Sequence, residues 1–318
     1  MAVRTILGTM EFGRRATMAE SLEMTQFFVN AGHKELDTAY MYSGGKSEEF
    51  IGDMPVSHDP NKVSVATKVN PWGPEGLTAE GVKKQFTTCL ERLRADSVDI
   101  LYLHAPDHKT PIEDTLAVVQ EFYKAGKFKE LALSNYAAWQ VVEIYYICKA
   151  NGYVLPTLYQ GMYNAFTRDI EKELLPALRR LGIRFYAYNP LAGGLMTGKY
   201  KYEDEDIPNS RFFGNSWSQT YRNRFWKKVY FDALDCIRDA MATAGNDASL
   251  TEVSLRWMYH HSQLAAANND GVILGASNMG HLTQNMAATE KGPLEPAVVE
   301  AFEKAWKMTA PGCEQYFR

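Results

Sequence analysis

The chain has 318 residues, of which 46% are hydrophobic, and a formal net charge of −4 at pH 7. This length and apolar content suit one α/β barrel with added loops, so we expect residues 1–318 to form a single domain. The slightly acidic balance argues against nucleic acid or an anionic membrane as the main partner. We therefore expect a small-molecule ligand.

Cysteine spacing and the N-terminal residues bear on the compartment. The four cysteines are far apart and form no CxxC pair, at Cys89, Cys148, Cys236 and Cys313. This spacing favours free thiols in a reducing compartment over a disulfide framework or a zinc site, so we expect no metal. Arg4 and Glu11 interrupt any apolar core of a signal peptide, and no apolar run approaches the roughly 18 residues of a membrane span. A cytoplasmic protein is the resulting expectation.

Eight short apolar segments alternate with longer amphipathic stretches. The segments predicted as strands are 5–8, 35–37, 63–68, 98–104, 130–134, 157–160, 184–188 and 271–275. Most are continuously apolar, as expected for parallel strands covered by helices. Eight such units predict an α/β fold of the closed (β/α)8 TIM-barrel type with long loops at its C-terminal rim.

Helix signals separate several of these strands. Thr110 looks like a cap that is followed by Pro111 in the first helical turn. A helix is also predicted over 169–181, where Pro176 either kinks it or lies near its start. The residues after Pro296 predict an additional C-terminal helix.

The segment 199–228 departs from this alternation, because it is polar, basic and rich in aromatic residues. A loop of this length in a compact domain is usually functional or disordered. Its aromatic content argues against disorder. We predict a functional loop here.

Four polar residues lie at or near the ends of three successive predicted strands. Asp37 and Tyr42 follow the second strand, Lys68 ends the third and His104 ends the fourth. In a parallel barrel these ends share one rim, where such enzymes keep their chemistry. Each residue alone is as readily a cap or a core residue. Their joint occurrence predicts a site that delivers a proton to a carbonyl oxygen.

Carbonyl reduction needs these four side-chain types. Hydride attack on carbon leaves negative charge on oxygen, which a donor must neutralise. Tyr42, with a free pKa near ~10, keeps its proton at neutral pH. We expect Lys68 to lower that pKa, Asp37 to hold Lys68 ionised, and His104 to orient the substrate oxygen.

A second oxidoreductase pattern competes with this one. Tyr42 and Lys46 have the Tyr-x-x-x-Lys spacing of short-chain dehydrogenases. That pair needs a helix to bring both side chains onto one face, and Gly44 and Gly45 between them make a helix improbable. The glycine-rich dinucleotide fingerprint is also missing near the N-terminus. We interpret this match as a coincidence and Lys68 as the working lysine.

The chain resembles the aldo-keto reductases from about residue 5 to its end. Its matching elements are Leu36-Asp37-Thr38-Ala39 with Tyr42, Thr67-Lys68, Leu103-His104, Leu133-Ser134-Asn135-Tyr136, Tyr159-Gln160, Tyr188-Asn189-Pro190-Leu191 and Ile273-Leu274-Gly275-Ala276-Ser277. The segments 103–108, 189–199 and 211–226 look like the branch of aflatoxin-aldehyde and succinic-semialdehyde reductases. The resemblance implies a barrel that uses NADPH, with Tyr42 as the acid, and the branch suggests a homodimer.

The resemblance also implies where the cofactor binds. Ser134, Asn135 and Gln160 would hold the nicotinamide carboxamide, Tyr188 would stack on its ring, and the segment 189–199 would wrap the pyrophosphate. The predicted cofactor contacts are Met10, Asp37, Ser134, Asn135, Gln160, Tyr188, Asn189, Pro190, Leu191, Gly193, Gly194, Lys199, Arg211, Ser277, His281, Gln284 and Asn285.

The far end of this site bears on the choice between NADPH and NADH. The resemblance places Ser277, His281, Gln284 and Asn285 at the adenine and the 2′-phosphate. Many relatives have Arg and Glu where this chain has His281 and Gln284, which weakens the inference of NADPH. Arg211 would add a cation that pairs well with phosphate. We predict NADPH.

The branch also implies a substrate pocket. Its predicted contacts are Tyr42, His104, Trp217, Tyr221, Arg224 and Arg318. Two arginines near a reducible aldehyde suit a carboxylate at the far end of the substrate. We therefore expect reduction of carboxyl-bearing aldehydes such as succinic semialdehyde and 2-carboxybenzaldehyde, and of dicarbonyls such as aflatoxin dialdehyde. The alternative is that both arginines make surface salt bridges.

A non-enzymatic role is the remaining alternative. The potassium-channel β subunits share this barrel and bind nucleotide, yet act chiefly as regulatory proteins, and a fold alone does not settle function. All four catalytic residue types are present in this chain, and the segment 199–228 resembles the soluble reductases. We favour an enzyme.

Overall fold

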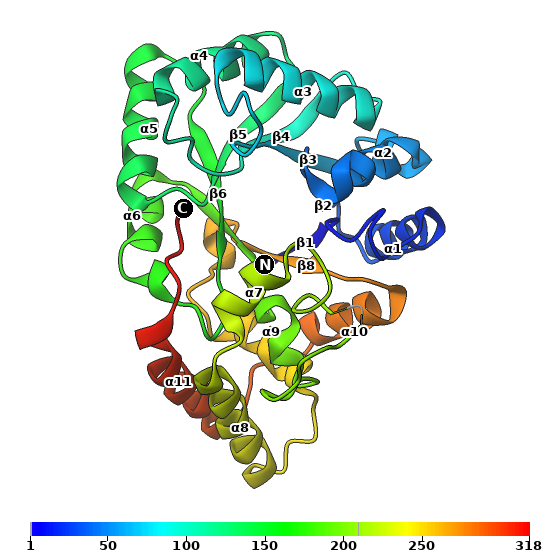
Figure 1. The fold of residues 1–318 in the computed structure, drawn as a ribbon, viewed down its shortest axis with the longest axis vertical. Coiled ribbons are helices and arrows are strands. Elements are labelled where there is room, and N and C mark those ends of the chain that lie inside the picture. Colours follow the sequence, from blue (N-terminus) through cyan, green and yellow to red (C-terminus); the bar gives the residue numbers. More distant parts are fainter. Residues whose placement is uncertain (1, 209) are drawn as a thin grey trace.

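The computed structural model describes residues 2–208 and 210–318. Eight parallel strands pair in chain order and close into one barrel, so the predicted (β/α)8 fold is confirmed. The strands are β1 (Arg4–Gly8), β2 (Glu35–Asp37), β3 (Ser64–Val69), β4 (Val98–Leu103), β5 (Phe128–Ser134), β6 (Pro156–Met162), β7 (Arg184–Tyr188) and β8 (Gly271–Gly275). Figure 1 shows helices around the outside of these strands.

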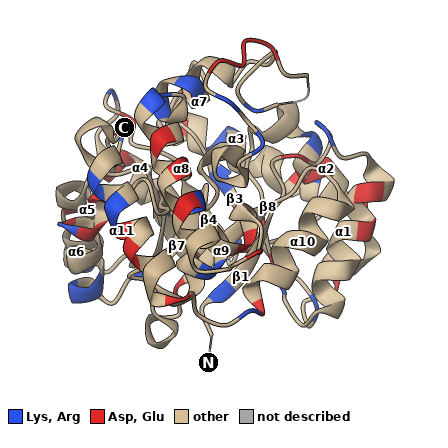
Figure 2. Cartoon of the chain, turned by 90° about the horizontal axis from the view of Figure 1, so that it is seen from below, with Lys and Arg blue, Asp and Glu red and all other residues tan. Residues whose placement is uncertain are grey.

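The helices connect the strands and extend the barrel at its C-terminal end. They are α1 (Met18–Asn30), α2 (Lys46–Asp53), α3 (Ala79–Leu93), α4 (Ile112–Lys124), α5 (Ala138–Asn151), α6 (Leu174–Leu181), α7 (Ser218–Phe225), α8 (Lys228–Thr243), α9 (Leu250–His260), α10 (Met279–Thr289) and α11 (Pro296–Thr309). The predicted C-terminal helix is α11, which packs beside α8 (Figure 1). Figure 2 places α7 and the C-terminus at one end of the barrel and the N-terminus at the other.

Side-chain alternation along the strands builds two apolar layers. In β4, Ile100 and Tyr102 belong to the cluster that fills the barrel, whereas Leu101 and Leu103 belong to the larger cluster between strands and helices. All four are at most 2% exposed. Burying a side chain of this size contributes about 1.5–3 kcal/mol. These layers hold the strand ends, and hence the rim residues, in fixed positions.

Two helix starts differ from the sequence predictions. Pro111 is the N-cap of α4 and lies outside the helix, while Thr110 donates its hydroxyl to Asp107 instead of capping. The predicted helix over 169–181 is interrupted: a short 3-10 turn covers Asp169–Glu171, and α6 begins afterwards with Pro176 in its first turn. Proline fits there because it lacks only an N–H that the first turn leaves unbonded.

In its described residues, 199–208 and 210–228, the segment 199–228 is more ordered than a loop. It contains α7, which we did not predict, and an aromatic cluster in which the ring of Trp226 lies 5.0 Å from those of both Phe212 and Phe213. Phe212 is fully buried. Aromatic pairs at such distances contribute about 0.5–1.5 kcal/mol beyond their burial. This cluster anchors the segment at the rim.

Three further expectations concern the whole chain. The four cysteines are free thiols, as predicted. Within residues 2–208 and 210–318, no group of three or more His, Cys, Asp or Glu side chains is arranged to hold a metal ion. No helix of these same residues has the length and apolar character needed to cross a membrane. Figure 2 shows Lys and Arg interspersed with Asp and Glu over the helices.

Candidate active site

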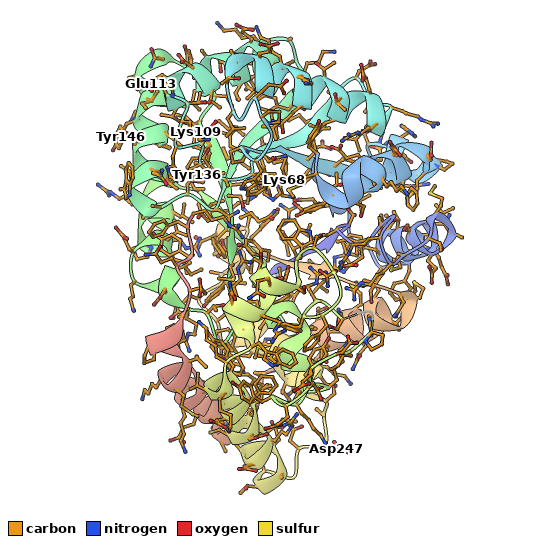
Figure 3. All side chains as sticks on the ribbon, viewed as in Figure 1. Lys68, Lys109, Glu113, Tyr136, Tyr146 and Asp247 are labelled. Atoms are coloured by element: carbon orange, nitrogen blue, oxygen red, sulfur yellow. The ribbon has the colours of Figure 1, made fainter. Side chains whose placement is uncertain are left out.

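Six of the predicted site residues are positioned by strand periodicity. Strand side chains alternate between two faces, so the residue two positions after one that fills the barrel also points inward. Lys68 thus follows Ala66, and Gln160 follows Leu158. Asp37, Ser134 and Tyr188 are placed by the same step in their own strands, after Glu35, Ala132 and Tyr186, and His104 follows Tyr102 directly past the end of β4. Figure 3 labels Lys68 inside the ring of strands.

Lys68 and Asp37 form a buried ion pair. The Lys68 ammonium donates to Asp37 Oδ1 and to the carbonyl of Thr38, both at 2.6 Å, and its side chain is 0% exposed. Gln160 donates its amide to the second oxygen of Asp37 at 2.8 Å. Burial lowers the pKa of Lys68 and the charge of Asp37 opposes that shift. Such a pair is tolerated inside a protein because each charge is partnered and hydrogen-bonded.

Tyr42 lies in a tight turn directly after β2. The turn Tyr42–Gly45 contains left-handed residues at Ser43 (φ 52°) and Gly44 (φ 66°), so no helix aligns Tyr42 with Lys46. Lys46 instead begins α2 and is exposed. Lys68 Nζ lies 5.1 Å from the centroid of the Tyr42 ring. The geometry therefore agrees with the choice of Lys68 as the working lysine.

The Tyr42 pKa is raised in this structure, whereas we expected Lys68 to lower it. Burial raises the pKa of Tyr42 well above its usual value, the charge of Asp37 raises it further, and the cation that opposes them most is Arg211. The positive charge of Lys68 is offset by the carboxylate in contact with it. Tyr42 is therefore a fully protonated phenol at neutral pH.

His104 is a neutral imidazole beside this phenol. Its ring lies edge-on to Tyr42 at 5.9 Å and to Trp72 at 5.1 Å. Burial and then the charge of Lys68 hold the pKa of His104 well below its usual value. Its Nδ1 atom is buried without a hydrogen-bond partner in the described part of the chain. His104 also lines the site cavity, so its ring can contact a ligand.

One cavity of about 440 Å³ collects the predicted residues. Every predicted cofactor and substrate contact lines it, together with Tyr42, Asp37 and His104, whereas Lys68 lies behind the wall. Near the predicted catalytic residues, the Asn135 amide donates a hydrogen bond to the carbonyl of His104 at 2.8 Å. The Asn135 side-chain oxygen accepts one from the Tyr188 hydroxyl, also at 2.8 Å. These bonds fix the wall on which we predict the nicotinamide.

Gly193 and Gly194 shape the cavity at a second place. Both have positive φ, at 68° and 100°, which favours glycine. A Cβ atom on Gly193 would lie 2.6 Å from the Tyr221 ring, whereas one on Gly194 would meet nothing within 4 Å. The turn therefore packs tightly against Tyr221 on the Gly193 side and stays open on the Gly194 side. A ligand can approach the main chain closely on the open side.

The model of the Aldo/keto reductase family matches residues 4–307. The chain belongs to the aldo/keto reductase family. Members of this family generally use NAD(P)H, and this protein is an oxidoreductase.

Mammalian relatives match this aldo/keto reductase over nearly its full length. Aflatoxin B1 aldehyde reductase member 2 of Homo sapiens is 54% identical over 322 residues, which cover 99% of this chain and 90% of the human protein. The Rattus norvegicus protein of the same name is 55% identical over 320 residues, covering 99% of this chain and 87% of the relative. Aldo-keto reductase family 7 member A3 of Homo sapiens is 50% identical over 320 residues, covering 99% and 97%. These relatives support aldehyde reduction as the reaction.

For two arginines of this aldo/keto reductase, the structure differs from the prediction made from the sequence. The predicted phosphate contact Arg211 forms an ion pair with Glu11 and donates to the Tyr221 hydroxyl at 2.9 Å, so its guanidinium faces the Tyr42 end. Arg15, which we did not predict, lines the cavity and acts electrostatically on Lys199 and His281. Arg15 carries no sequence signal beyond its charge, which explains why it was missed.

A second missed group supports the Tyr42 turn from behind. Arg92 of α3 donates to the carbonyl of Tyr40 at 2.8 Å and pairs with the buried carboxylate of Glu48 at 3.1 Å. A Cβ atom on Gly45 would lie only 2.4 Å from the Arg92 guanidinium. Glu48 also accepts the hydroxyl of Thr67, which adjoins Lys68. This network ties the turn of Tyr42 to the strand of Lys68.

Proposed function

We propose that this enzyme reduces carboxyl-bearing aldehydes and dicarbonyls to alcohols with NADPH, and that Tyr42 is the proton donor. The observation that carries the proposal is the position of Tyr42, which lines the cavity between the buried Lys68–Asp37 pair and the ring of His104. It brings a loaded proton donor and a neutral imidazole ring to one point.

The cavity suits an extended dinucleotide. Its lining continues from Asn135 and Gln160 through the Gly193 turn to Ser277 and His281. When bound, the dinucleotide supplies the hydride. Asn135 and Tyr188 would support the nicotinamide end, and the open face of Gly194 would admit the pyrophosphate close to the backbone.

Proton transfer is carried out by four residues, namely Tyr42, Lys68, Asp37 and His104. Tyr42 gives its hydroxyl proton to the carbonyl oxygen as charge develops there, and the phenolate regains a proton from solvent after the alcohol leaves. The raised pKa of Tyr42 keeps this proton in place before substrate binds. Lys68 and Asp37 hold a fixed dipole under the ring, and neutral His104 supplies a hydrogen bond to the same oxygen. Preorganised groups of this kind stabilise a developing oxyanion without rearrangement.

Two unpaired guanidinium groups favour an anionic substrate. Arg224 and Arg318 line the cavity, and neither has a carboxylate partner within the described residues. Arg224 lies 6.0 Å from the Tyr221 ring and Arg318 lies 5.8 Å from the Trp72 ring. The alternative of surface salt bridges therefore loses its support. A carboxylate between the two arginines would gain charge-assisted hydrogen bonds.

The test is turnover of matched aldehydes. NADPH oxidation is followed at 340 nm with 2-carboxybenzaldehyde, with benzaldehyde and without aldehyde. We expect NADPH consumption with both aldehydes and a higher kcat/KM for the carboxylated one. Equal kcat/KM values would remove the arginine clamp and leave the reductase, whereas no consumption with any aldehyde would refute the proposal.

A further inference from the structure

A cluster of positive charge lies at the end of the cavity away from Tyr42. It consists of Arg15 between β1 and α1, Lys199 after β7, and His281 in the first turn of α10. All three line the cavity, and Lys199 and His281 each experience the charge of Arg15. Three separate parts of the chain therefore bring two permanent cations and one titratable imidazole to one place.

This wall has more cations than anions. Its buried carboxylate, Glu11, accepts hydrogen bonds from Arg14, Arg15 and Arg211. Burial alone would raise the pKa of Glu11, but these arginines hold it down at about 2. Lys199 has no ion pair within the described residues and lies 5.0 Å from the Tyr200 ring. At this end of the cavity one carboxylate, Glu11, stands against the permanent cations Arg15 and Lys199, which leaves a net positive surface that an anion of high charge would neutralise.

His281 is the titratable member of this cluster. Its Nδ1 lies 3.0 Å from the Ser277 hydroxyl, so the ring is already oriented. Partial burial, then Lys199 and Arg15, lower the pKa of His281 below its usual value. Without a ligand, the imidazole is therefore mostly neutral at pH 7.

On the helices packed against α10, the carboxylates of Glu252 and Glu20 are already engaged with other partners. On α9, Glu252 pairs with Arg256 at 3.3 Å, and Ser249 is 3.4 Å from the Gln284 amide. At the start of α1, the Glu20 carboxylate is held by the backbone and hydroxyl of Thr17. The charges that face His281 from the cavity are thus those of Lys199 and Arg15.

We propose that His281 reads the 2′-phosphate of the cofactor by taking up a proton when that phosphate binds beside Lys199 and Arg15, so that the preference for NADPH over NADH weakens as pH rises. The inference rests on the proposed function, because it requires NADPH as the cofactor.

The proton balance follows from electrostatics. A phosphate monoester is largely dianionic above its second pKa of about 6. Placed against the ring, it favours imidazolium and raises the pKa of His281 towards or above neutrality. The proton comes from solvent and settles on an imidazole nitrogen. Between the free and the phosphate-bound pKa, binding therefore consumes a proton, and NADH, which lacks the phosphate, consumes none here.

Isothermal titration calorimetry measures this proton directly. NADP⁺ and NAD⁺ are titrated into the enzyme at pH 7 in two buffers of different ionisation enthalpy. We expect uptake of a substantial fraction of one proton with NADP⁺ and almost none with NAD⁺. Linkage limits the associated loss of NADP⁺ affinity to at most about tenfold per pH unit, and we expect a loss of roughly threefold to tenfold from about pH 6.5 to 8.5.

Three variants decide the origin of the proton. His281→Gln should abolish the extra uptake and flatten the pH dependence, and His281→Arg should keep NADP⁺ preference at every pH without uptake. His260→Gln is the matched control, because His260 is exposed outside the cavity and bonds to the Lys291 carbonyl. It should behave as the wild type.

The outcomes separate the two proposals. Undiminished proton uptake in His281→Gln, or equal uptake with NAD⁺, would overturn the inference while an enzyme that binds NADP⁺ and reduces aldehydes keeps its proposed function. Failure of both dinucleotides to bind would overturn both.

Discussion

The two ends of the cavity use charge in opposite ways. Around Tyr42 the charges are paired: Lys68 and Asp37 neutralise each other inside the barrel, and His104 stays uncharged. Around His281 they are unbalanced, because Lys199 has no ion pair in the described part of the chain.

This difference teaches what each end can do. In a buried ion pair, the mutual attraction and the hydrogen bonds offset part of the cost of burial, and the pair is a fixed dipole that can stabilise charge that appears during a reaction. An unpaired cluster gains most when an anion arrives, so it serves binding and selection. Chemistry and cofactor choice are therefore separable by mutation.

Removing the Tyr42 hydroxyl should show most clearly that the two ends of the cavity have separate roles. We expect Tyr42→Phe to lower kcat by about 10²–10⁴-fold, because the proton donor is lost while the ring remains. NADPH binding, followed by tryptophan fluorescence, should keep its Kd. A large loss of NADPH affinity would mean that the two ends are coupled.

Breaking the buried pair should affect both stability and turnover. Lys68→Met leaves Asp37 as a buried carboxylate without a cation, and we expect a loss of about 3–5 kcal/mol in the free energy of unfolding, with activity lost as well. Urea denaturation and kcat measure the two effects. Lys46→Met is the control, because Lys46 is exposed and begins α2, and retained activity is expected. The reverse pattern would restore the Tyr-x-x-x-Lys interpretation.

The substrate side of the comparison is tested by Arg224→Ala. We expect kcat/KM for succinic semialdehyde to fall about 10- to 100-fold, as loss of a charged hydrogen bond predicts, and that for butanal to change little. Arg222→Ala is a matched control on the same helix, since Arg222 lies against the Phe213 ring outside the cavity lining. A similar fall for both aldehydes would contradict a carboxylate clamp.

Glu35 offers a contrast with the buried Lys68–Asp37 pair, because the cation paired with this buried carboxylate, Arg4, lies partly in solvent. It accepts from Tyr186 at 3.1 Å, while its partner Arg4 is half-exposed at 3.6 Å. Burial raises the pKa of Glu35 to about 7. The folded state therefore binds a proton that the unfolded state releases between about pH 4.5 and 7, so stability falls as pH rises through this window.

Glu35→Gln should remove that penalty. We expect the variant to be more stable than the wild type by roughly 1–3 kcal/mol at pH 8 and nearly equal to it at pH 5. The difference between the two unfolding free energies cancels the other titrating groups. A variant that is less stable at pH 8 would show that the Arg4 pair outweighs the burial.

Much of the fold and of the site's composition could be predicted from local patterns. Strand ends such as Lys68 and His104 are readable because apolar segments stop there and strand alternation fixes the inward face. The α7 helix could not be read in this way, because its sequence is polar and aromatic and its place depends on packing against residues such as Phe212.

Electrostatic consequences were less predictable than residue identities. That the charge of Lys68 is offset depends on the 2.6 Å contact with Asp37, and that Arg211 faces Tyr221 depends on Glu11. Both are tertiary contacts between segments far apart in sequence. The place of Arg15 in the site likewise depends on tertiary structure and not on a local sequence pattern.

A crystal structure with NADP⁺ and a carboxylate such as phthalate tests the division of the cavity most directly. We predict the nicotinamide beside Tyr42 and Tyr188, the 2′-phosphate in ion-pair contact with Lys199 and His281, and the carboxylate between Arg224 and Arg318. A 2′-phosphate bound at Arg211 near Tyr42, or a dinucleotide outside this cavity, would contradict the account.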